Sequence, residues 1–211
     1  MLVAFALLVH QAKAEQQIPE HETFLISVAD EGHIVAWYKN YITKAYTELG
    51  YRIVYKPLPP GRGHVEAQKG YVDALAIRVS AIENSFPDFI RVPVLLAKGQ
   101  LMLYCQTDLT CNKDILLDHK NVIGIVSGSN ITGQFMKNKV ASVYEVRDGL
   151  KLAEMFNKQR LNYILTIDSH EFGNYASIDV NKYTSVALAP IEAYHYLHKK
   201  HRHLLADVET A

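Results

Sequence analysis

The sequence carries no net charge, because its 22 basic and 22 acidic residues cancel. It therefore lacks the positive excess that sequence-independent binding to nucleic acid requires, and we expect no nucleic-acid partner. It also lacks any run of the roughly 20 apolar residues that a transmembrane helix needs. With 49 % hydrophobic and 21 % charged residues over 211 positions, the composition is that of a globular chain with one large or two small domains.

Catalytic motifs are also missing. There is no Gly-x-Ser-x-Gly turn for a nucleophilic serine, no His-Glu-x-x-His pair and no cysteine with a plausible histidine partner. Charged and hydroxyl side chains instead follow several expected strands, which is typical of a binding site. We therefore predict that the protein is not an enzyme and uses no cofactor.

Residues 1–14, MLVAFALLVHQAKA, combine an apolar run of about eight residues with the small-x-small pattern Ala12-Lys13-Ala14. This pattern predicts a signal peptide, export to the periplasm and a mature chain that begins near Glu15. The positively charged start of a signal peptide is missing, so an apolar N-terminal helix is the alternative.

The first half of the chain alternates strand and helix patterns. The expected order is strand 24–29, helix 33–49, strand 52–55, helix 64–69 and strand 72–77. Pro59, Pro60 and Gly61 mark a loop before the second helix, and Gly50 and Gly70 close the two helices. This order predicts the parallel three-stranded start of a doubly wound α/β sheet.

Arg78 directly follows the buried strand 72–77. Open α/β sheets bind ligands at the carboxyl ends of their strands, so Arg78 is a candidate ligand-binding residue, with Ser80 beside it. Its guanidinium can take a carboxylate through two parallel hydrogen bonds. Arg62, in the proline loop, is the next candidate for holding an anion.

Asp30 follows the strand 24–29 and is expected at the same edge of the sheet as Arg78. It can bind the ammonium group of a ligand, or it can cap the helix that follows. Arg78 can also pair with Asp30 or Glu31 as a structural ion pair. The sequence leaves these alternatives open.

The second half repeats the alternation. The expected elements are strand 122–126, helix 131–139, strand 143–146, a helix that begins at Asp148, and strands 159–168 and 183–188. The turn at residues 127–130 leads into the first of these helices, whose free N–H groups and dipole attract anions. Ser129 and Asn130 are therefore candidate ligand-binding residues, and either can be a plain N-cap.

Two segments carry a resemblance to a known family. Residues 70–74 read G-x-V-D-A and precede a strand, and residues 86–93 read F-P-x-F-I-R-V-P. Both are similar to segments of the periplasmic solute-binding proteins of the amino-acid-binding class, extracellular solute-binding family 3. The family's Thr-x-x-Arg, whose Arg holds the ligand α-carboxylate, is replaced here by Ile82-Glu83-Asn84-Ser85. The ligand class of the family therefore does not carry over.

The resemblance implies a two-lobed α/β fold, the type II periplasmic-binding-protein-like fold, in which each lobe is a mostly parallel sheet flanked by helices. Lobe 1 is expected over residues 24–97 and 186–211, and lobe 2 over residues 101–185. The chain is expected to cross between the lobes at hinges over residues 98–100 and 186–190.

The resemblance also implies a role for Asp168. Residues 159–168 are similar to the family's Gly-Arg-x-Asp strand, which ends in an acidic residue that grips the ligand amino group. Asp168 or a neighbour takes that position, although Asn162 replaces the usual Asp of the motif. Alternatively, Asp168 caps a short helix over residues 169–175.

Cys105 and Cys111 flank a short, mostly polar stretch. In an oxidising compartment this spacing predicts a disulfide, with a metal pair or two unrelated thiols as the alternatives. Residues 191–211 are expected to form a long helix carrying His195, His198 and His201. These histidines could meet as zinc ligands, but a basic run on a helix is usually solvated, so we predict no metal site.

Taken with the resemblance, these features predict a monomeric periplasmic protein that captures a small polar solute between two lobes. The expected solute is anionic or zwitterionic and amino-acid-like, and an inner-membrane permease of an ABC-type uptake system is the further candidate partner. The alternative is a ligand-sensing or regulatory domain of the same fold that is not coupled to transport.

Overall fold

The computed structural model describes residues 22–28, 32–58, 60–80, 83, 86–171, 173–174 and 176–211. Within these ranges, the side chains of residues 32–36, 60, 61, 63, 64 and 130 are not described. The predicted signal peptide and the candidate residues Asp30 and Glu31 lie outside the described residues.

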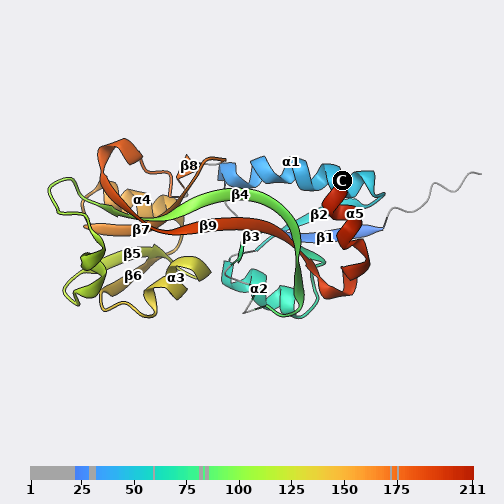
Figure 1. Ribbon diagram of the computed structural model, residues 1–211, viewed down its shortest axis with the longest axis horizontal. Coiled ribbons are helices and arrows are strands. Elements are labelled where there is room, and N and C mark those ends of the chain that lie inside the picture. Colours follow the sequence, from blue (N-terminus) through green and yellow to red (C-terminus); the bar gives the residue numbers. More distant parts are fainter. Residues whose placement is uncertain are drawn as a thin grey trace, which may run out of the picture.

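The chain forms a mixed α/β fold (Figure 1). The strands are β1 (Thr23–Val28), β2 (Arg52–Pro57), β3 (Ala74–Val79), β4 (Phe89–Cys105), β5 (Val122–Val126), β6 (Ser142–Val146), β7 (Tyr163–Ser169), β8 (Gly173–Asn174) and β9 (Thr184–His198). The helices are α1 (Gly32–Glu48), α2 (Pro60–Gln68), α3 (Asn130–Met136), α4 (Gly149–Asn157) and α5 (Leu205–Thr210), and 3₁₀ turns cover Lys113–Leu117, Val180–Lys182 and Lys199–Leu204.

The strands form one sheet in the order β2-β1-β3-β9-β4-β7-β5-β6, with β8 paired to β7. β1 pairs in parallel with both β2 and β3, and β5 pairs in parallel with both β6 and β7. These two parallel groups are the two strand-helix series predicted from the sequence. The prediction of an α/β fold with two parallel strand groups flanked by helices is confirmed, but the two groups belong to one continuous mixed sheet and not to two separate sheets.

A long antiparallel ribbon of β4 and β9 joins the two parallel groups (Figure 1). On one side lie β1, β2, β3, α1, α2 and α5, which we call the β1 half, and on the other lie β5 to β8, α3 and α4, the β5 half. Each half has its own apolar clusters, one built around Phe24, Tyr38 and Tyr46 and another around Leu152 and Phe156. The exact lobe boundaries and hinges remain a prediction, because the ribbon makes the sheet continuous.

Two boundaries in the β1 half differ from the expected ones. α2 begins at Pro60 rather than at His64, because proline at the first helical position loses no helix hydrogen bond. Arg62 therefore lies on α2 and not in a loop. β3 runs to Val79, so Arg78 lies inside the strand, one residue before its end, and not after it.

The expected helix over residues 191–211 is wrong. β9 continues to His198, and only a 3₁₀ turn and the short helix α5 follow. Pro190 does not end the strand, because β9 pairs with β3 only from Ala193 onward and so has an open edge at the proline. The histidines therefore do not share a helix face. No group of three metal-ligating side chains exists among the described residues.

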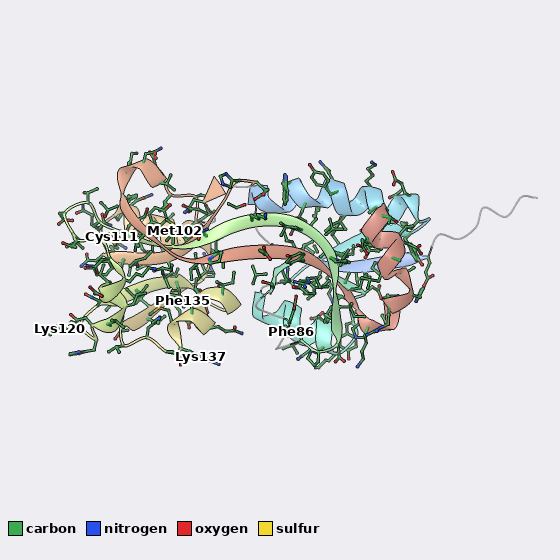
Figure 2. All side chains as sticks on the ribbon, viewed as in Figure 1. Phe86, Met102, Cys111, Lys120, Phe135 and Lys137 are labelled. Atoms are coloured by element: carbon green, nitrogen blue, oxygen red, sulfur yellow. A yellow bond between two sulfur atoms is a disulfide. The ribbon has the colours of Figure 1, made fainter. Side chains whose placement is uncertain are left out.

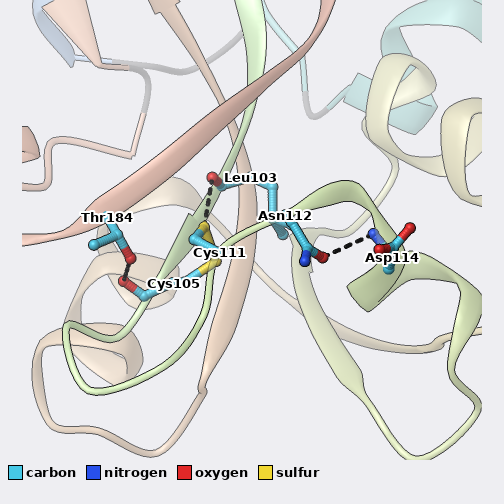
Figure 3. The surroundings of a disulfide bond; sticks show 6 residues. All are labelled: Leu103, Cys105, Cys111, Asn112, Asp114 and Thr184. Carbon is cyan, nitrogen blue, oxygen red and sulfur yellow. Dashed lines mark hydrogen bonds between the residues drawn. A yellow bond between two sulfur atoms is a disulfide. The ribbon is translucent and has the colours of Figure 1, made fainter.

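The predicted disulfide is confirmed: Cys105 and Cys111 are bonded, with their Cα atoms 5.7 Å apart (Figure 3). Cys105 is the last residue of β4 and is fully buried, and the bond closes the loop that follows this strand. The loop is therefore tied to the core of the β5 half.

Removing this disulfide is expected to lower the free energy of unfolding by roughly 2 kcal/mol, the chain-entropy value for so short a loop. Urea unfolding of the Cys105→Ala, Cys111→Ala variant beside the oxidised wild type measures the difference. Wild type unfolded in the presence of a thiol reductant is the matched control, because it loses the bond and keeps both side chains. Equal stability of oxidised and reduced wild type would contradict the prediction.

Within the described parts of the chain, none of the helices combines the length and the apolar character needed to cross a membrane.

Candidate functional site

The carboxyl ends of β3 and β7 approach the middle of the ribbon from opposite directions. Through β9, Val79 at the end of β3 lies level with Ala97 of β4, and Ser169 at the end of β7 lies level with Gly99. The two strand ends are thus two residues apart along β4. Across the ribbon, three strand spacings separate β3 from β7, or about 14 Å, and β9 and β4 lie between them. We call this region the junction.

Arg78 is the cation nearest the end of β3. Its side chain is half-buried, and one guanidinium nitrogen, Nη1, donates a hydrogen bond to the carbonyl oxygen of Ile77 at 2.6 Å. Ser80 follows the strand in a half-buried turn. Arg62 is exposed on α2. The structure therefore brings Arg78 and Ser80 together at the junction and places Arg62 on a neighbouring helix.

Asp168 lies inside β7, opposite Gln100 of β4 and opposite Asn174 of β8. The expectation that it caps a helix over residues 169–175 is therefore wrong: the described part of that stretch turns back as β8. The two carboxylate oxygens have separate donors. The Tyr104 hydroxyl donates to Oδ2, and the Asn174 amide donates to Oδ1 at 2.5 Å.

Tyr104 and Asn174 are parts of the site that the sequence did not indicate. Burial, and then the Asp168 carboxylate, raise the pKa of the Tyr104 phenol, so the hydroxyl keeps its proton and donates. Asn174 is itself fixed, because its Oδ1 accepts from the backbone N–H of Ala176 at 3.0 Å. The pairing of β4 with β7 sets Tyr104 opposite Ile164, and its side chain reaches Asp168 four residues further along β7. No local sequence signal indicates this pairing.

Gly99 lets β4 and β7 pass closely beside Asp168. A Cβ atom at this position would lie 2.3 Å from the backbone oxygen of Asp168, a distance that real Cβ atoms do not show. The glycine is therefore required by the close approach of the two strands, at the point where the first hinge crossing was predicted.

The start of α3 follows the carboxyl end of β5, the strand that neighbours β7 in the sheet. Ser129 is the N-cap residue by position, but its side chain makes no capping hydrogen bond, and Asn130 is the first helical residue. Two hydroxyls on elements at this edge, Ser27 of β1 and Thr132 of α3, are buried and have no hydrogen-bond partner among the described residues. Buried hydroxyls without partners are uncommon, so both are further candidates for contact with a ligand or with water.

Glu83 stands in the segment Ile82-Glu83-Asn84-Ser85, for which the resemblance implied a carboxylate-binding arginine in place of these residues. Its carboxylate accepts a hydrogen bond from the Tyr196 hydroxyl at 3.0 Å and lies 3.3 Å from the Arg91 guanidinium. Glu83 is therefore held by side chains of β4 and β9. Because Glu83 is negatively charged, it cannot bind an anion at the junction. Arg78, the cation of β3, is the remaining candidate.

The junction thus combines a half-buried guanidinium, hydroxyl groups and an oriented carboxylate from two halves of the molecule. Such groups can hold a zwitterion by its two ends, the carboxylate on Arg78 and the ammonium group on Asp168. Their roles remain predictions.

No family model matches the sequence, and no curated protein matches it. Solved structures do share the fold. A substrate-binding protein of an ABC uptake transporter from Streptococcus pneumoniae, with bound histidine, superposes with a TM-score of 0.67 at 14 % identity, covering 89 % of this chain and 84 % of that one. The arginine-bound form of ArgBP from T. maritima gives 0.69 at 10 % identity, with 89 % and 93 % covered.

A third match is an ancestral amino-acid-binding protein that is a precursor of cyclohexadienyl dehydratase. It has a TM-score of 0.65 and 11 % identity, and covers 89 % of this chain and 87 % of that one. The matches are mostly binding proteins, although this one is a precursor of an enzyme. The chain therefore has the fold of the amino-acid substrate-binding proteins of ABC transporters.

Proposed function

We propose that the protein is a solute-binding protein that captures a small, amino-acid-like solute at the junction and delivers it to an ABC-type permease. The solute carries a negative charge or is a zwitterion. The carrying observation is the opposed approach of β3 and β7 to the ribbon from two halves, with Arg78 level with Leu95 of β4 and Asp168 level with Gln100.

The two hydrogen bonds that hold the Asp168 carboxylate support this proposal. Tyr104 and Asn174 fix the carboxylate, so a ligand ammonium group would meet a charge that is already oriented. The N-terminus of α3 follows the carboxyl end of β5, which neighbours β7 in the sheet, and would add backbone N–H groups there. Closure about residues 98–100 and 186–190 would then bury the solute between the halves.

Export to the periplasm belongs to the same proposal. It is supported by the signal-peptide pattern of residues 1–14 and by the disulfide, since disulfides persist in oxidising compartments. A sensing domain of the same fold would need the same site, so the structure does not favour either role. A permease and an ATPase encoded beside the gene would favour transport.

A thermal-shift screen tests the binding function. A ligand that binds only the folded state at about 100 times its dissociation constant adds roughly 2.7 kcal/mol of stability. For a chain of this length that corresponds to a rise in melting temperature of roughly 5–10 °C. We expect such a rise with one or more amino acids or small carboxylates, and none with their amides, which lack the negative charge.

The screen includes oligopeptides and simple amines. A response to amines alone would contradict an anionic or zwitterionic solute, and no response to any class at millimolar concentration would contradict solute capture.

A further inference from the structure

A hollow of about 450 Å³ lies on the β5 half, at the amino ends of β5 and β7. Val122, the first residue of β5, and Tyr163, the first residue of β7, both line it. Asp168 lies five residues further along β7, or about 16 Å away at the usual rise of a strand. Figure 2 shows Lys120, another lining residue, at the end of the molecule that points away from the β1 half. The hollow is therefore separate from the junction.

The charge of this hollow is positive. Lys120 and Arg160 line it and are exposed, and no acidic side chain is among the described residues that line it. Neither cation has an ion pair among the described residues.

The acidic residues that are close in sequence to Lys120 and Arg160 have other partners. The Asp118 carboxylate accepts the backbone N–H of Lys120 at 2.9 Å. Glu154 lies between Lys151 and Lys158, at 2.7 and 2.9 Å from their amino groups. The two lining cations, Lys120 and Arg160, therefore remain available to an anion from solution.

The rest of the lining combines two amides, Asn121 and Asn162, with apolar and aromatic residues. Leu161 is buried, Met155 is half-buried, and Tyr144 and Tyr163 each bring an aromatic ring with a hydroxyl at the end. A volume of about 450 Å³ falls in the range of small-molecule sites. Apolar and aromatic side chains beside two amides and two cations suit a molecule that has both a flat apolar part and an anionic group.

We propose that this hollow, which we call the Lys120–Arg160 site, is a second ligand site that binds a small organic anion. The anionic group, a carboxylate or a phosphate, pairs with Lys120 and Arg160. The aromatic or apolar part packs on Met155, Leu161 and the tyrosine rings. The proposal does not depend on solute capture at the junction, because the two sites share no residue.

Backbone amide NMR of the full chain tests the proposal, with phenyl phosphate and benzoate as probes. We expect saturable shifts at Val122 and Tyr163, and the stronger probe shows whether the site prefers a phosphate or a carboxylate. Inorganic phosphate is expected to bind at least about tenfold more weakly than phenyl phosphate, because it lacks the apolar part.

Arg160→Gln and Lys120→Gln are each expected to weaken the stronger probe about tenfold or more, because each removes a charge-assisted contact. Both side chains are exposed, so the melting temperature should not change. Lys137→Gln is the matched control: Lys137 is an exposed cation of the same half that does not line the hollow (Figure 2).

Shifts that occur only around Ser129 and Arg78 would place the probes at the junction and overturn the proposal. Equal affinity in Arg160→Gln, Lys120→Gln and wild type would also overturn it, as would a linear response without saturation for both probes.

Discussion

Replacing Arg78 with alanine is expected to weaken the binding of an anionic solute by roughly 2–4 kcal/mol, the scale for removing one member of a buried charged pair. The solute is the one identified by the thermal-shift screen. The guanidinium is always charged, and the side chain is half-buried near the end of β3, so solvent screens it less than an exposed charge. Calorimetric titration measures the loss.

The melting temperature of the ligand-free protein separates the two readings of Arg78. A ligand-binding role predicts little change in it, whereas a structural ion pair predicts a loss of stability before any ligand is added. Arg78→Lys is expected to keep part of the affinity, because it keeps the charge and loses the two-pronged geometry. Arg52→Ala, which removes an exposed arginine of β2, is the control for net charge.

Normal binding by Arg78→Ala would move the anion site elsewhere, and Arg62 on α2 would be tested next. The exposure of Arg62 makes it the weaker candidate, because solvent screens an exposed charge.

Most of the fold was predictable from local patterns. The spacing of apolar residues gave β1, α1 and β2 nearly residue by residue, and Gly50 and Gly70 end their helices at positive φ values of 85° and 73°. The Ser127–Asn130 turn was likewise placed correctly before α3. These elements are fixed by sequence-local physics: periodicity, capping and backbone conformation.

The misplaced elements depend on distant pairing. Residues 191–198 have a pattern that fits a helix as well as a strand, and only β4 and β3 on either side make them a strand. Pro190 is tolerated within β9 only because of an open edge, which the sequence does not show. Asp168 was predicted, but its partners Tyr104 and Asn174 were not, since they reach it through strand pairing alone.

The free energy of unfolding is expected to fall by about 3 kcal/mol between pH 7 and pH 4 because of His195. Its side chain is buried, and burial lowers its pKa from 6.5 to about 4. Between these two values the unfolded chain binds a proton that the folded chain does not, so stability falls with falling pH and levels off below about 4. The size follows from roughly 1.4 kcal/mol for each pH unit.

The hydrogen bonds of His195 explain why it stays neutral. Nδ1 lies 3.0 Å from the carbonyl oxygen of Ala76, which can only accept, so Nδ1 carries the proton. Nε2 then accepts from the Tyr46 hydroxyl at 2.8 Å. Both ring nitrogens are satisfied in the neutral form, and the pair ties β9 to α1 and β3. Protonation would place a charge in this buried contact.

Urea unfolding at several pH values between 7 and 4 measures the effect, with His195→Gln compared to wild type. The variant is expected to lose about 3 kcal/mol less than wild type over this range. His198, whose pKa is also lowered by burial, acts in the same direction in both proteins and cancels in the comparison. The carboxylates with lowered pKa, such as Asp73 and Glu154, contribute mainly at the acid end of the range and cancel likewise.

His119→Gln is the matched control, because it removes an exposed histidine and leaves His195 and its buried contacts in place. Should His195→Gln not fold, the NMR titration of the His195 ring in wild type gives the same information. A midpoint near 6.5, or equal pH slopes in wild type and His195→Gln, would show that the ring reaches solvent and that the contact between Tyr46 and His195 opens before the protein unfolds.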